Sequence, residues 1–174
     1  MFKKLVYILI LSPVLMATTC EDNECSVIES PDNKTIDLIE FTPLQAEYNQ
    51  GDALLLTINV PATNTYFEEE INLREATGDK VAKITLFSSN IFDDNKLNFI
   101  KGSQGREANW FNLPYNKKTE RYELEVEITL NRTGLYFHYN GGEIDFGTSN
   151  CPDYTLKTNI LGVDDIAVEF SVIK

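Results

Sequence analysis

The ten residues 121–130 constrain the fold more than any other stretch of the chain. Charged or polar residues and apolar residues alternate there without a fault, and the apolar ones are Tyr122, Leu124, Val126, Ile128 and Leu130. A helix cannot bring every second residue onto one face, whereas successive side chains of a β-strand point to opposite faces. The stretch therefore predicts a strand with one face in a core and the other in water, which is typical of an antiparallel sheet.

The same period of two recurs along the chain. Shorter alternating runs, separated by turn sequences such as Asn140-Gly141-Gly142, cover residues 53–60, 82–86, 97–99, 135–139, 154–160 and 166–172. Residues 36–41 predict an edge strand that Pro43 ends. Residues 68–74 fit a helical turn or a strand, and we favour the strand. The pattern predicts an all-β domain of about seven to nine short strands.

One short motif adds a family resemblance. Gly134-Leu135-Tyr136 follows an alternating strand and resembles the tyrosine-corner region of immunoglobulin-like domains, in which a tyrosine hydroxyl bonds back to the preceding loop. The resemblance implies an immunoglobulin-like antiparallel β-sandwich. The disulfide at the centre of that family's domains is absent, since Cys25 and Cys151 lie near the margins of the chain, so the detailed topology is not implied.

The first nineteen residues have the layout of a secretory signal peptide. Lys3 and Lys4 precede an apolar run over residues 5–16, and small residues at 17–19 precede Cys20. The apolar run is shorter than the roughly 20 residues that a membrane-spanning helix needs. We therefore expect residues 1–19 to be removed.

Residues 15–20 resemble the lipobox of bacterial lipoproteins. The resemblance implies that Cys20 carries acyl chains such as palmitate and becomes the first residue of the mature protein. The alternative is an ordinary signal peptide cleaved near Cys20. Residues 21–24, Glu-Asp-Asn-Glu, resemble an export signal of some Gram-negative lipoproteins, or are a solvated acidic tether. We expect a lipid-anchored protein of the bacterial outer membrane, on its cell-surface or periplasmic face.

The mature chain is expected to contain a polar tether and one domain. Residues 20–35 form the predicted lipidated tether, and residues 36–174 are long enough for a single domain with a substantial core. In an oxidising envelope, Cys25 and Cys151 are expected to form a disulfide, and two unbonded buried thiols are the alternative.

The charge of the chain limits its partners. Lys and Arg total 15 against 27 Asp and Glu, a net charge of −12. Removing residues 1–19 takes away two lysines and no acid, which leaves 13 against 27 and a net charge of −14. This sign argues against nucleic acid and anionic lipid as partners.

The residues that could support catalysis or metal binding form no recognisable motif. His138 is the only histidine and lies within a predicted strand, so we interpret it as a packed strand residue and not as a catalytic base. Asp93, Asp94 and Asn95 could offer oxygens to calcium, but the spacing of an EF-hand is missing. We expect a protein that is not an enzyme and that uses no metal or cofactor.

The aromatic segment 109–115 is the most suggestive of binding. Trp110 is the only tryptophan, and together with Tyr115 and nearby Asn side chains it could form a platform for a sugar or a protein surface. A buried core anchor is the competing interpretation of Trp110. With Asn140, these residues are the expected ligand-binding residues. We expect a non-catalytic binding module for an envelope protein or a glycan, or else a structural accessory subunit of an outer-membrane complex.

Overall fold

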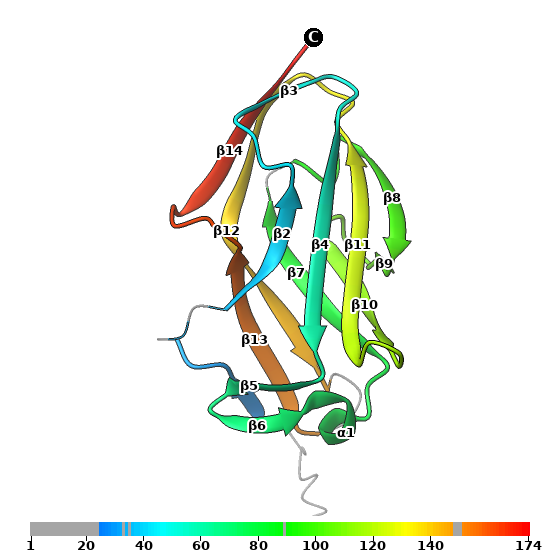
Figure 1. Cartoon of the computed structure of the whole chain (residues 1–174), viewed down its shortest axis with the longest axis vertical. Coiled ribbons are helices and arrows are strands. Elements are labelled where there is room, and N and C mark those ends of the chain that lie inside the picture. The colour runs from blue at the N-terminus through cyan, green and yellow to red at the C-terminus, as the bar shows by residue number, and fades with distance from the viewer. Residues whose placement is uncertain (1–24, 33, 35, 89, 148–150) are drawn as a thin grey trace, which may run out of the picture.

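The computed structural model describes residues 25–32, 34, 36–88, 90–147 and 151–174 (Figure 1). The predicted signal peptide, Cys20 and residues 21–24 lie outside this part. Its elements are β1 (Val27–Glu29), β2 (Asp37–Thr42), β3 (Glu47–Asn49), β4 (Ala53–Pro61), β5 (Thr63–Phe67), β6 (Glu69–Asn72), α1 (Leu73–Thr77), β7 (Val81–Ser88), β8 (Lys96–Lys101), β9 (Ser103–Gln104), β10 (Trp110–Asn116), β11 (Arg121–Thr129), β12 (Gly134–Phe146), β13 (Asp153–Ile160) and β14 (Ala167–Ile173). The described residues contain no helix with the length and apolar character of a membrane span.

Seven strands close into a barrel. They pair in the order β13-β2-β4-β11-β10-β7-β12, and β12 pairs again with β13. The prediction of an all-β fold is confirmed, but the prediction of an immunoglobulin-like sandwich is wrong. Strands of a sandwich and of a small barrel both bury one face and expose the other, so their alternation cannot distinguish the two architectures. The distinction lies in the pairing of β13 with both β12 and β2, which closes the ring.

Additional strands extend the barrel wall. The first part of β12 pairs with β14, whose last residues pair with β3, while the second part of β12 pairs with β13. On β11, residues 125–129 pair with β8, and only residues 121–122 pair with β10. The hairpin β5–β6 and α1 lie at one end of the molecule, and β3 lies at the other (Figure 1).

The barrel interior is apolar, as the alternation of β4 and β11 predicts. The buried members of these strands are Leu54, Leu56, Ile58, Val60, Tyr122, Leu124, Val126 and Ile128. Glu123, which we expected in water, is also buried. It accepts hydrogen bonds from Asn116 Nδ2 (2.9 Å) and Thr119 Oγ1 (3.0 Å). Burial raises the pKa of the Glu123 carboxyl, but these hydrogen bonds and the Lys101 ammonium outweigh it and lower the pKa.

Residues 68–78 combine the two interpretations of that stretch. Strand β6 is followed by α1, whose N-cap is Asn72; its side chain accepts a hydrogen bond from Glu75 N (3.1 Å). Gly78, with φ of 74°, ends the helix. We expected β2 to be an edge strand, but it pairs with β13 on one side and with β4 on the other. Pro43 follows the last residue of β2, so the missing N–H of this proline removes no hydrogen bond from the strand.

The predicted turn at residues 140–142 is wrong, because β12 continues through it. The register between β12 and β7 shifts between His138 and Gly142, which identifies a β-bulge. A Cβ atom on Gly142 would come within 3.0 Å of both Leu86 Cδ2 and Thr85 O. The glycine therefore permits a close approach of two strands and does not reverse the chain.

The tyrosine-corner bond is present although the sandwich is not. The Tyr136 hydroxyl donates to Arg132 O at 2.8 Å, and the Tyr136 ring is buried against Phe170. This bond fixes one turn at the start of β12. A local hydrogen bond of this kind can stabilise the start of a strand in a sandwich or in a barrel. The motif therefore does not distinguish the two folds.

The predicted pairing of Cys25 with Cys151 is present in the structure, with Cα atoms 5.1 Å apart. Just beyond the bond, β1 pairs in parallel with β13 from Val27 and Asp153 onward. Part of the stretch that we predicted as a tether is therefore a strand of the sheet.

Candidate ligand-binding pocket

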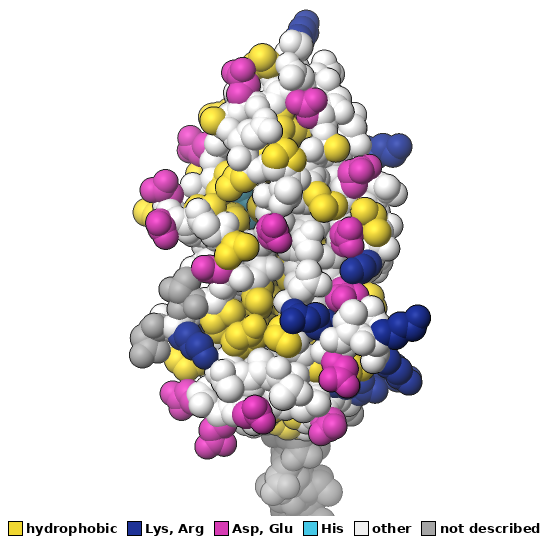
Figure 2. Space-filling view, in the orientation of Figure 1, with side chains coloured by type: hydrophobic (Ala, Val, Ile, Leu, Met, Phe, Trp, Pro, Cys, Tyr) yellow, Lys and Arg dark blue, Asp and Glu magenta, His cyan; other side chains and the backbone are white. Residues whose placement is uncertain are grey.

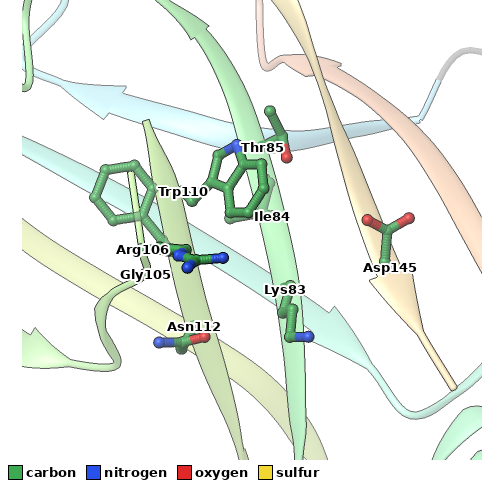
Figure 3. Close-up of a pocket in the computed structure, with 9 residues that line it drawn as sticks. Lys83, Ile84, Thr85, Gly105, Arg106, Trp110, Asn112 and Asp145 are labelled. Atoms are coloured by element: carbon green, nitrogen blue, oxygen red, sulfur yellow. The ribbon is translucent and has the colours of Figure 1, made fainter. Parts of the chain in front are cut away.

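A pocket of about 350 Å³ lies on the outer face of the barrel, over β7, β10 and β12 (Figure 3). It is built from strand residues and from the loop that leads into β10. The lining residues are Lys83, Ile84, Thr85, Gly105, Arg106, Trp110, Phe111, Asn112 and Asp145.

Cross-strand pairing brings the outward side chains together. Trp110 of β10 lies opposite Thr85 of β7, and Asn112 lies opposite Lys83. On its other side, Lys83 lies opposite Asp145 of β12. Directly opposed residues of antiparallel strands place their side chains on the same face. Because Ala82 and Ile84 face the core, these five side chains line the outside of the barrel.

Trp110 is a surface residue. Its side chain is 38% exposed, whereas the neighbouring Phe111 is 1% exposed and packs edge-on against Phe92 with ring centroids 4.9 Å apart. Phe111 thus has the role of core anchor that was the competing interpretation of Trp110. The indole is left on the outer face, at the pocket.

The loop before β10 carries the second wall of the pocket. Gly105 N donates to Trp110 O at 2.7 Å, and a Cβ atom at Gly105 would lie 2.9 Å from Trp110 Cβ. Only glycine allows the loop to pass this close to the tryptophan. Asn112 Nδ2 also holds the preceding strand β9 by donating to Gln104 O (3.2 Å). These contacts place Arg106 beside Trp110 (Figure 3).

Two cations and one carboxylate line the pocket. Lys83 and Arg106 form no ion pair with any residue in the described part of the chain. The Asp145 carboxylate accepts a hydrogen bond from Thr155 Oγ1 at 2.9 Å. In Figure 3 the Lys83 ammonium points away from Asp145. The lining therefore carries two unpaired positive charges and one negative charge whose side chain is already bonded to β13.

Tyr115 and Asn140 lie away from this pocket. Tyr115 is at the opposite end of β10, where its ring packs against Tyr122 and lies 5.8 Å from the Arg74 guanidinium carbon. The Asn140 side chain donates to Val163 O (2.7 Å) and Asp165 O (3.0 Å) and accepts from Ile160 N (2.7 Å). The structure thus does not bring the three predicted ligand-binding residues together.

His138 is a buried core residue, as its place in a strand predicts. It is 0% exposed, between the edges of Phe41 and Phe92. Its Nδ1 bonds Tyr139 O, and its Nε2 has no hydrogen-bond partner among the residues that the structure describes. Burial lowers the pKa of the imidazole to about 4, against a weaker opposing effect of the Tyr139 carbonyl. The ring is therefore neutral at pH 7 and out of reach of a substrate.

Two of the three residues that we considered for calcium, Asp94 and Asn95, bond to other residues of the protein. Asp94 pairs with Arg132. Asn95 Oδ1 accepts from Asn131 N (2.8 Å), and its Nδ2 donates to Ile91 O (2.9 Å). Within the described ranges, no three His, Cys, Asp or Glu side chains are grouped as a metal site would require.

The sequence prediction missed Lys83, Arg106 and Asp145, whereas Asn112 belongs to the aromatic segment that it singled out. Their proximity depends on strand register, but one sequence signal points to the region. Residues 74–121 contain nine Lys or Arg against six Asp or Glu, whereas the rest of the chain contains six against 21. Most Lys and Arg side chains visible in Figure 2 accordingly lie along the side formed by β8 to β11. All lining residues of the pocket except Asp145 come from this more positive stretch.

Comparison with known proteins gives no assignment: no protein family model, curated protein or solved structure matches the chain significantly. The pocket itself is the basis of the functional proposal.

Proposed function

We propose that the protein is a lipid-anchored envelope protein that binds a glycan in the Trp110 pocket. The observation that carries the proposal is an exposed indole set among polar side chains in a pocket of defined size. A sugar ring offers apolar C–H faces and a rim of hydroxyl groups. An aromatic face and convergent polar groups match both features.

The size of the pocket favours a glycan over a protein partner. Its volume of about 350 Å³ is near the lower end of the range for small-molecule pockets, which is roughly 300–1,000 Å³. A stable protein interface needs about 800 Å² from each partner. A pocket on three strands suits one or two sugar residues and supplies only a small part of such an interface.

The chemistry of the pocket supports binding without catalysis. Asp145 is the one carboxylate among its lining residues, and it is bonded to Thr155. Most glycosidases need two carboxylates across the scissile bond. We therefore propose retention of the glycan and not its cleavage.

The proposed anchor would hold the pocket close to the membrane. Cys25 lies five positions after Cys20 in the sequence, and Cys25 is bonded to the barrel through Cys151. An extended chain of that length spans at most about 18 Å. Growth of cells on labelled palmitate, with Cys20→Ser as the control, tests this part of the proposal. Label in the Cys20→Ser variant, or an unlabelled wild-type protein in the soluble fraction, would contradict lipidation.

A glycan array tests the binding function. We expect the purified protein to retain particular glycans and the Trp110→Ala variant to lose them, with the thermal unfolding midpoint almost unchanged because Trp110 is a surface residue. Tyr139→Ala is the matched control, since Tyr139 is an exposed aromatic outside the pocket. Equal retention by wild type and Trp110→Ala, or no retention of any glycan by wild type, would refute the proposed function.

A structural accessory role is the second candidate. Leu135, Tyr139 and Ile166 are exposed apolar residues near the paired strands β12 and β14. Exposed apolar groups can mark a protein contact. Co-purification of fixed partners from detergent extracts, lost in a Leu135→Glu variant, would support this role. A free monomer in the same extracts would contradict it.

A further inference from the structure

We infer that the glycan bound in the Trp110 pocket is acidic, carrying carboxylate or sulfate groups. The inference rests on the proposed function and specifies its ligand class. It depends on Lys83 and Arg106, which lie on different elements and line the same pocket.

The two cations have no internal role that would explain them. Neither pairs with an acid in the described part of the chain, although the protein has a large excess of acids. Lys101, Arg132 and Lys157 form ion pairs, but most other Lys and Arg side chains of the described residues do not, so the position of Lys83 and Arg106 in the pocket is what distinguishes them. Lys83 and Arg106 are therefore available to an external anion.

Asp145 is the carboxylate of the lining that opposes an anionic ligand, and Glu143, which lies opposite Thr85, faces the same side of the barrel without lining the pocket. Asp145 lies opposite Lys83 on the neighbouring strand, yet no ion pair joins these two side chains. Its carboxylate is directed to Thr155 of β13. The lining consequently has two positive charges against one negative charge, and the negative one is at the β12 side of the pocket (Figure 3).

The surrounding charge distribution favours the same ligand. The stretch 74–121, which contributes all lining residues except Asp145, has three more Lys and Arg than Asp and Glu. Exposed charges more than about 8 Å apart are screened at physiological salt. The charges that line the pocket therefore determine its potential more than the net charge of −12 on the whole chain, or cations outside the pocket such as Lys117 and Lys118, do.

The types of side chain explain how such a glycan would be recognised. A guanidinium can donate two parallel hydrogen bonds to a carboxylate or sulfate, and an ammonium adds a compact positive charge. Arg106 lies beside Trp110, so a pyranose stacked on the indole would place an acidic substituent within reach of the guanidinium (Figure 3). Asn112 Oδ1 and the Thr85 hydroxyl line the same space and could bond sugar hydroxyls.

The test uses a glycan array that carries uronate-, sialate- and sulfate-containing oligosaccharides, each beside the neutral form made by esterifying or removing its acid groups. Wild type, Lys83→Gln/Arg106→Gln and the matched control Lys117→Gln/Lys118→Gln are compared. The control removes the same charge from the β10–β11 turn, outside the pocket. Circular dichroism and thermal unfolding confirm that each variant is folded.

We expect retention of acidic glycans, little retention of their neutral forms, and a loss of affinity on the order of tenfold in the pocket variant, from the energy of two exposed ion pairs. The control variant should retain at least half of the wild-type affinity. Equal binding of acidic and neutral forms, or an equal loss in both double variants, would overturn the inference while leaving glycan binding intact. Absence of binding to every glycan would refute the proposed function itself.

Discussion

The buried histidine makes the stability of the barrel depend on pH in a defined way. The pKa of His138 is about 4 in the folded protein, against the ordinary value of 6.5 for an exposed imidazole. Above pH 6.5 both the folded and unfolded forms are neutral at this residue. Between pH 6.5 and 4 the unfolded chain binds a proton that the folded protein excludes, so the free energy of unfolding falls as the pH falls.

The size of this effect follows from the two pKa values. A shift of one pKa unit corresponds to about 1.4 kcal/mol, so His138 should lower the free energy of unfolding by about 2 kcal/mol between pH 7.5 and pH 5, and by about 3 kcal/mol at pH 4. Below pH 4 its contribution becomes constant. Carboxylates also titrate in this range, and a variant is needed to separate them.

Urea unfolding of wild type and His138→Met from pH 7.5 to pH 4 measures the effect. Methionine has a similar volume and does not titrate, so the difference between the two pH profiles isolates the imidazole. Loss of the Tyr139 hydrogen bond adds a cost that is independent of pH. Since the chain has one histidine, its NMR titration needs no assignment. Parallel stability profiles, or an imidazole that titrates near pH 6.5 in the folded protein, would refute the reasoning.

Three further predictions concern the covalent and close contacts of the barrel. Removing the bond between Cys25 and Cys151, which are 126 residues apart, should lower the free energy of unfolding by about 4–5 kcal/mol in the chain-entropy model; urea unfolding with and without dithiothreitol measures this, and equal midpoints would contradict it. Asn140→Ala should cost roughly 1–3 kcal/mol, because the partly buried backbone groups of Ile160 and Val163 lose their partner, while glycan retention is unchanged; a loss of retention in a folded variant would instead return Asn140 to the proposed binding site. Gly142→Ala should cost roughly 1–3 kcal/mol through the clash with Leu86, and a thermal midpoint equal to that of wild type would show that the strands separate without strain.

The sequence predicts the strands of this protein better than their arrangement. The parity of residues 54–60 and 122–128 is sufficient to assign β4, β11 and their buried faces. Closure of the barrel depends on the parallel contact of β13 with β2, between residues more than a hundred positions apart. Alternation within one strand contains no information about that partner.

Glycine and asparagine explain the error in β12. Asn140-Gly141-Gly142 has the composition of a hairpin turn, and the same residues are suited to a β-bulge where two backbones approach. The pairing of β12 with β7 on both sides of these residues, at His138 and again at Gly142, distinguishes the two. The sequence therefore shows where the strand is irregular, but it does not distinguish a hairpin turn from a β-bulge.

The candidate pocket was predictable in part. The sequence singles out Trp110, but two adjacent aromatic residues in one strand leave open which of them faces outward. Because Phe111 and Leu113 are buried, the alternate residues Trp110 and Asn112 face outward. Lys83 and Arg106 come from separate stretches of the chain, and they meet Trp110 only through strand register and the close packing of Gly105.

The position of the disulfide also determines how the protein would bear mechanical tension. Cys25 lies two residues before β1, and Cys151 lies two residues before β13. These two strands pair in parallel. A tensile force applied to the chain before Cys25 would therefore be transmitted through the disulfide to the N-terminal ends of both β1 and β13. Such a load does not peel β1 from β13, and it passes directly into a strand of the closed wall. A force applied to the chain on the N-terminal side of Cys25 would therefore act on the barrel as one body.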